Sequence, residues 1–310
     1  MTAVLSTRHC ALAVVVAAIG FGTTGTAQTF APAGAEPLSV GAIRLLVGGL
    51  LLALIGGVRY YRHVGRTLPR FTTGFWWVLL GAGSVMAYQA TFFAGTRANG
   101  VAVGTVVALG SSPLFAGLFE WLGFGRRPTR RWAVATGLAV AGMVLLTGLS
   151  GGAAVDPSGV LASLGAGASY GGYTVATKAV LRRGWDATSA VSAMLGLGAL
   201  LADFILMGTD NTWIATGRGL AVVAWLGAVT VVGAYLLLGH GLRGLSAATA
   251  TTLTLAEPAT ASLLGVLVLG EMLTDWQFAG IAAMAAGVLI AGTERAGDQV
   301  DARRAPTPAR

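Results

Sequence analysis

The stretch "LTLAEPATASLLG", from Leu253 to Gly265, places a glutamate beside a proline inside an apolar segment. Glu257 brings a charge into this segment, and Pro258 removes a backbone N–H and clashes with the preceding helical turn. Within a bilayer, an interrupted helix is tolerated only where protein groups or the water of a cavity satisfy the freed carbonyl groups. The stretch therefore predicts a broken transmembrane helix that borders a polar cavity.

The rest of the chain has the composition of a multi-pass membrane protein. Of its 310 residues, 55% are hydrophobic and only 10% are charged, whereas about a quarter of the residues are charged in an average soluble domain. Apolar segments of about 20 residues, long enough to cross a bilayer, recur along it. We predict an all-α integral membrane protein with ten spans, at 10–30, 38–58, 74–96, 99–123, 131–149, 158–181, 187–208, 217–240, 244–270 and 276–293.

The two ends of the chain need separate interpretation. Arg8 and His9 precede an apolar segment that would also suit a signal peptide, but its length favours a retained first helix. Residues 295–310 are polar, mixed in charge and contain proline, which predicts a disordered tail.

Basic residues indicate the orientation in the membrane. With the N-terminus inside, 17 of the 20 Lys and Arg residues lie on the cytoplasmic side, Lys178 among them. The positive-inside rule then predicts that both termini are cytoplasmic. Contact with anionic headgroups accounts for the net charge of +8, so no nucleic-acid partner is predicted. The single cysteine, Cys10, excludes an internal disulfide and a cysteine-based zinc site.

An internal repeat relates the two halves of the chain. The only prolines inside the predicted spans are Pro113 and Pro258, 145 residues apart, and we expect each to interrupt its helix. Aligning the chain with itself at this offset superposes the span ends, which divides it into repeats at residues 1–150 and 156–294. Because each repeat has an odd number of spans, the two must have inverted topology. Secondary transporters typically have this architecture, with the substrate site near the midplane.

Glu257 and Arg44 are the strongest candidates for a substrate or coupling site. Intramembrane carboxylates nearly always face a bundle interior or a wet cavity, so Glu257 suits proton coupling or a cationic substrate group. A structural ion pair or a protonated, hydrogen-bonded Glu257 is the alternative. Arg44 could hold an anionic substrate group bidentately, or it could extend to the outer interface and bind helix-end carbonyls.

Other polar and aromatic side chains inside spans suit a cavity that stacks an organic ligand, although each of them alone also suits helix packing. They are Gln28, Tyr88, Gln89, Tyr170, Tyr173 and Tyr235. The hydroxyl groups of the ninth span are equally suited to helix packing. Glu120 is a weaker candidate near the cytoplasmic end, within reach of Arg126. No metal site or cofactor is predicted.

Two enzyme signatures occur, and both lie in the wrong context. The G-x-S-x-G at 167–171 is inside an apolar helix rather than a strand-to-helix turn. The G-x-G-x-x-G at 239–244 connects two spans and has no βαβ unit around it. We therefore expect no enzyme activity.

The segment "LAEPATASLLGVLVLGEMLTDWQFAGIAAMAAGVLI" (255–290) resembles the end of an EamA domain in the drug/metabolite transporter superfamily. The matching residues are Glu257, Pro258, Gly270, Glu271, Gln277, Gly280 and Gly287, with Gly22, Arg44, Pro113 and Gly142 in the first half. Arg126 departs from the pattern, because it stands where the second half has Glu271.

The resemblance covers about residues 10–293 as two tandem domains. It implies ten helices, inverted repeats and alternating access in a bacterial plasma membrane, often with export of amino acids or related metabolites. The alternative functions are those of a multidrug exporter and of a metabolite importer or exchanger, while a membrane enzyme or a scaffold is disfavoured. The sequence also leaves open whether the protein is a homodimer.

Overall fold

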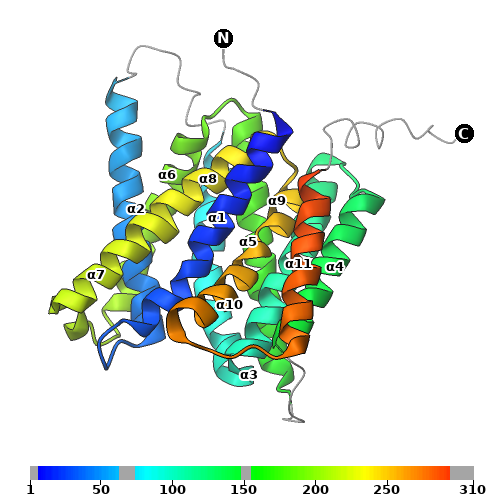
Figure 1. The fold of residues 1–310 in the computed structure, drawn as a ribbon. Coiled ribbons are helices and arrows are strands. Elements are labelled where there is room, and N and C mark those ends of the chain that lie inside the picture. Colours follow the sequence, from blue (N-terminus) through cyan, green and yellow to red (C-terminus); the bar gives the residue numbers. More distant parts are fainter. Residues whose placement is uncertain (1–5, 63–73, 148–154, 294–310) are drawn as a thin grey trace, which may run out of the picture.

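The computed structural model describes residues 6–62, 74–147 and 155–293, and within these ranges all regular elements are helices (Figure 1). Seven helical segments of this part of the chain are long and apolar enough to cross a membrane. The predicted disordered tail at 295–310 lies outside the described residues. The helices are α1 (Thr7–Thr29), α2 (Pro37–Arg62), α3 (Phe75–Phe124), α4 (Arg130–Thr147), α5 (Pro157–Arg182), α6 (Ala187–Leu206), a 3-10 turn (Thr212–Ala215), α7 (Gly217–Trp225), a π-helix (Leu226–Gly233), α8 (Ala234–Gly241), α9 (Ala247–Leu253), α10 (Ala256–Leu269) and α11 (Asp275–Gly292).

The long helix α3 is a hairpin of two helical arms. Gly100 has φ 79° and ψ 159°, a conformation that favours glycine. A Cβ atom added to Gly104 would lie 2.8 Å from the Cα atom of Thr96, whereas residues eight apart in a straight helix are about 12 Å apart. The chain therefore folds back at Gly100, and the two arms correspond to the predicted third and fourth spans.

Helix α5 packs against both arms of this hairpin. A Cβ atom at Gly159 would meet Ala98 on the first arm at 2.7 Å, and one at Gly171 would meet the backbone of Ala116 on the second arm at 2.8 Å. Small residues let the helix axes approach closely, which is the usual way that helices associate in membranes. The first arm runs antiparallel to α5 and the second runs parallel to it.

Two pairs of helices from opposite halves of the chain pack in antiparallel order. On α4, Gly142 faces Gly280 of α11, and Ala139 faces Gly287, about two turns further along α11. Figure 1 shows α4 and α11 side by side at one edge of the bundle. Helix α2 crosses α6 in the same antiparallel sense, through the contacts of Gly49 with Ala199 and of Gly56 with Ser192.

The helix does not break at Pro113, where we expected an interruption. Pro113 lies inside the second arm of α3, and the only non-helical backbone angles within α3 are those of Gly100. Proline leaves the carbonyl four residues earlier without its N–H partner. That carbonyl belongs to Leu109, and it accepts a hydrogen bond from the Ser112 hydroxyl at 2.8 Å. This side-chain bond compensates for the proline, so the helix continues.

Candidate functional site

The broken helix predicted from sequence consists of α9 and α10, and the chain leaves the α-helix at Thr254 and Leu255. Pro258 then lies in the first turn of α10, where a missing N–H is tolerated. The Thr254 carbonyl, which Pro258 cannot bond, accepts a hydrogen bond from the Glu257 N–H at 2.9 Å. Glu257 is thereby held at the N-terminal end of α10, whose dipole favours a negative charge.

A cavity of about 410 Å³ lies beside this break. Its volume is in the range of small-molecule sites in proteins, about 300–1,000 Å³. Seven of the eight site side chains predicted from sequence line it: Gln28, Arg44, Tyr88, Gln89, Tyr170, Tyr235 and Glu257. They come from α1, α2, α3, α5, α8 and α10, so segments far apart in the sequence share one cavity. Their role in binding stays a prediction.

Tyr173 is the eighth predicted side chain, and it lies behind the cavity instead of lining it. It is buried beside a small void of about 20 Å³ that Arg44 and Tyr88 also border. Its ring packs edge-on against Tyr235, with the ring centroids 5.4 Å apart. Tyr173 therefore supports the wall of the cavity.

Aromatic rings form much of the wall, and the sequence reasoning missed part of this surface. Phe92 and Phe93 line the cavity, and Phe92 stacks on Tyr88 with ring centroids 5.4 Å apart and planes at 12°. The signal was available, because Phe92 follows Tyr88 by four residues and so shares its helix face. Phe21 packs edge-on against Tyr235 at 5.0 Å.

The polar groups of the cavity include two opposite charges. Among the described residues no ion pair joins Arg44 to Glu257, although both line the cavity. Gln89 donates a hydrogen bond to the Gly41 carbonyl, one turn before Arg44, at 3.1 Å. Within the described residues, the buried Tyr170 hydroxyl makes no hydrogen bond of normal geometry, although the Thr254 side chain is near enough to affect it. An anionic group and a cationic group of one bound molecule would each find an oppositely charged side chain in this lining, and such binding stays a prediction.

Within the described residues, the lining of the cavity extends from Glu257 toward one end of the bundle. Its lining includes Gln28 near the end of α1, Val101 just after the α3 hairpin, Thr147 at the end of α4, and Ser262 on α10. The positive-inside prediction assigns these positions to the outer half of the membrane. On the other side of Glu257, all residues of α9 are buried.

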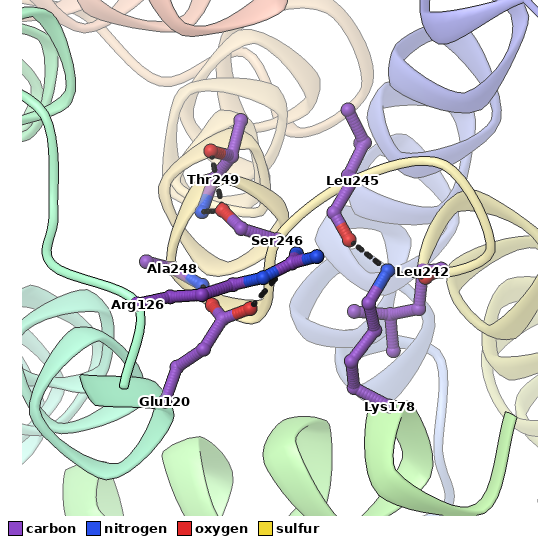
Figure 2. A network of polar contacts seen from close by, with 8 residues as sticks. All are labelled: Glu120, Arg126, Lys178, Leu242, Leu245, Ser246, Ala248 and Thr249. Atoms are coloured by element: carbon purple, nitrogen blue, oxygen red, sulfur yellow. Dashed lines mark hydrogen bonds and ion pairs between the residues drawn. The ribbon is translucent and has the colours of Figure 1, made fainter. Parts of the chain in front are cut away.

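Two buried charges lie beyond α9, at the predicted cytoplasmic end (Figure 2). Lys178, which was counted among the cations of the cytoplasmic side, is only 7% exposed and donates hydrogen bonds to the carbonyls of Leu242 and Leu245. Glu120 is 3% exposed and accepts a hydrogen bond from the Ala248 N–H at 3.2 Å. The sequence did contain a signal for a special role of Lys178, because it is the one lysine among 20 Lys and Arg residues.

Comparisons with known proteins agree with this architecture. The model of the family described as "EamA-like transporter family" matches residues 9–148 and 157–293. A Bacillus subtilis (strain 168) protein described as "Uncharacterized transporter YwfM" is 43% identical over 280 residues, which cover 90% of this chain and 92% of that protein. An uncharacterized protein of Pseudomonas aeruginosa is 30% identical over 242 residues, which cover 77% of this chain and 78% of that protein. A chain from a crystal structure superposes with a TM-score of 0.75 at 21% identity, over 91% of this chain and 96% of that chain, which indicates a shared fold.

Proposed function

The chain belongs to the EamA-like transporter family, and on that premise we propose that it is a secondary transporter that exports an amino acid or a related small metabolite by alternating access. The family and the helices that can span a bilayer make it a multi-pass membrane protein. We assign it to the plasma membrane of a bacterium, with both termini in the cytoplasm. A multidrug exporter and a metabolite importer or exchanger are the alternative functions with the same fold.

The single observation that carries the proposal is the pair of opposite charges in one aromatic-walled cavity. Arg44 and Glu257 line it together with Tyr88 and Phe92. A guanidinium group binds a carboxylate in a bidentate manner, and Glu257 would take the ammonium group of the same molecule. An amino acid pairs with both charges at once, while a purely cationic drug would leave Arg44 unpaired.

Packing between the halves supports ten spans in two inverted repeats. The helices make ten spans when each arm of α3 counts as one span, the segment from α7 to α8 as one, and the segment from α9 to α10 as one. In this scheme α4 and α11 are counterparts, as are α2 and α6, and both pairs pack antiparallel. Antiparallel counterparts are expected when one repeat is inverted relative to the other, and the substrate site of such transporters lies between the repeats.

We assign proton or substrate-cation exchange to Glu257 as access alternates. The test uses purified protein in proteoliposomes loaded with mixed amino acids, and measures counterflow and pH-driven movement of radiolabelled amino acids. Glu257→Gln keeps size and hydrogen bonding but removes the charge, so pH-driven transport should stop. Counterflow exchange should continue with a weaker apparent affinity for the amino acid, because a neutral amide cannot pair with the ammonium group. Glu271→Gln is the matched control, because Glu271 is an exposed glutamate just after α10 and outside the cavity lining.

Normal pH-driven transport by Glu257→Gln would sink the coupling role and leave Glu257 as a packing residue. Absence of amino-acid counterflow in the unmodified protein would sink the substrate assignment. A survey of internal and external metabolite pools in cells with and without the protein would then identify both the substrate and the direction.

A further inference from the structure

We propose that Lys178 and Glu120 form a latch that holds α9 as the cytoplasmic plug of the cavity, and that transport requires the latch to release. The inference rests on the proposed transport function. Both are positioning residues, because they act through the backbone of the segment from Leu242 to Ala248 and not on a substrate.

The plug is evident from burial. Every residue of α9 is buried, and Glu257, which follows the break after α9, lines the cavity. A hydrogen bond of 2.7 Å between the hydroxyls of Thr252 and Thr136 joins α9 to α4. A solute in the cavity therefore cannot reach the predicted cytoplasmic end unless α9 moves. Helix α9 is composed of alanine, threonine and one leucine, so Leu253 is its only large side chain, and it is buried in the hydrophobic core.

Lys178 holds the turn before the plug. Its Nζ atom donates to the Leu242 carbonyl at 2.7 Å and to the Leu245 carbonyl at 2.6 Å. These carbonyls follow the C-terminal end of α8, where a positive charge is favourable. Because an ammonium group is compact, it fits between two backbone carbonyls where a planar guanidinium would not.

Glu120 holds the start of the plug from the opposite side. Its Oε2 atom accepts a hydrogen bond from the Ala248 N–H at 3.2 Å. Its Oε1 atom lies 4.0 Å from Arg126 and has no hydrogen-bond partner within the described part of the chain. Figure 2 shows Glu120 and Lys178 reaching toward the same segment from two different helices, α3 and α5.

This arrangement is sensitive to the position of α9. Buried charges are stable only while they keep their partners, and an unpaired buried charge is costly. Moving the segment 242–248 away breaks the contacts of both charges, so release requires water from the cytoplasmic side to replace the lost backbone groups. The latch therefore stays closed while water is excluded from the cytoplasmic end, and it opens when water reaches the two charges.

The native cysteine provides the first readout. Cys10 is the single cysteine, it is 2% exposed, and its Sγ atom would lie 2.6 Å from a Cβ atom on Gly244, in the latched turn. We expect Lys178→Met and Glu120→Ala to accelerate the reaction of Cys10 with a charged maleimide at least roughly tenfold in nanodiscs, as expected for lost hydrogen bonds to charged groups. Arg243→Met is the matched control, because it removes an exposed cation from the same turn and should leave the rate unchanged.

A second reporter separates a latch from simple loosening of the structure. Ser262→Cys, in a Cys10→Ala background, introduces a thiol that lines the outer part of the cavity. If the latch controls alternating access, Lys178→Met should slow labelling at position 262 while it accelerates labelling of Cys10. Lys178→Arg should not restore the labelling rates of the unmodified protein.

Faster Cys10 labelling with unchanged or faster labelling at position 262 would overturn the latch and make the two charges structural supports. Unchanged labelling at both positions in the folded variant would overturn it as well. If Lys178→Met does not fold, Glu120→Ala, which removes the hydrogen-bond acceptor for the Ala248 N–H, carries the same pair of measurements. None of these readouts requires a substrate, so failure of the latch is distinguishable from failure of the proposed transport.

Discussion

The contact between α1 and α10 leads to a quantitative prediction at Gly22. A Cβ atom at Gly22 would lie 2.7 Å from the Cβ atom of Thr260 and 2.8 Å from the backbone carbonyl oxygen of Glu257. Ordinary contacts begin at 3.4 Å, so Gly22→Ala must separate the two helices by about 0.7 Å (3.4 minus 2.7). Overpacking of this kind typically costs about 1–3 kcal/mol.

The matched control is Gly25→Ala, one turn further along α1. A Cβ atom at Gly25 meets nothing within 4 Å, yet both positions are helix-interior glycines on the cavity wall. Each substitution gains about 1 kcal/mol of helix propensity, and this gain cancels in the comparison. We therefore expect Gly22→Ala to be less stable than Gly25→Ala by about 1–3 kcal/mol.

The assay is equilibrium unfolding of the two purified variants in the same detergent, followed by amino-acid counterflow. Because the displaced backbone includes Glu257 itself, Gly22→Ala should also reduce pH-driven transport. Equal stability of the two variants would refute the close α1–α10 contact, and with it the geometry of the cavity wall.

Three further predictions follow from other parts of the structure. If Arg44 binds a substrate carboxylate, Arg44→Lys should weaken apparent affinity in counterflow at normal protein abundance, because a point charge cannot replace the planar fork. Reporter fusions after Arg183 should report the cytoplasm and fusions after Asp275 the outside, and a cytoplasmic signal after Asp275 would contradict the inverted repeat. The Ser158 N–H donates to the Asp156 carboxylate at 2.8 Å, and this hydrogen bond holds the pKa of Asp156 below its usual range. The stabilisation by Asp156 is therefore present above its unfolded pKa of about 3.9 and disappears as the pH falls through the lower folded pKa. The pH dependence of unfolding in this range should be absent in Asp156→Asn.

Hydropathy and proline chemistry determined the main features of this protein from sequence. A bilayer requires every backbone polar group to be satisfied within the protein, so long apolar segments predict helices without knowledge of their neighbours. The same constraint made the Glu257–Pro258 pair informative, and the structure has its helix break four residues before Pro258. Polar and ionisable side chains inside apolar segments are expected to face the protein interior, and seven of the eight predicted side chains line one cavity.

Tertiary packing decided the features that depend on remote partners. Pro113 and Pro258 are equivalent in sequence, but only at Pro113 does a preceding serine donate to the freed carbonyl of Leu109, and there the helix continues. The sequence indicates only that Lys178 belongs to the cytoplasmic side, whereas the α8–α9 turn places two carbonyls around it, and it is buried. Local sequence determines where a helix can form or end, whereas burial of a particular side chain depends on segments that lie 60 or more residues away and contact it only in the folded bundle.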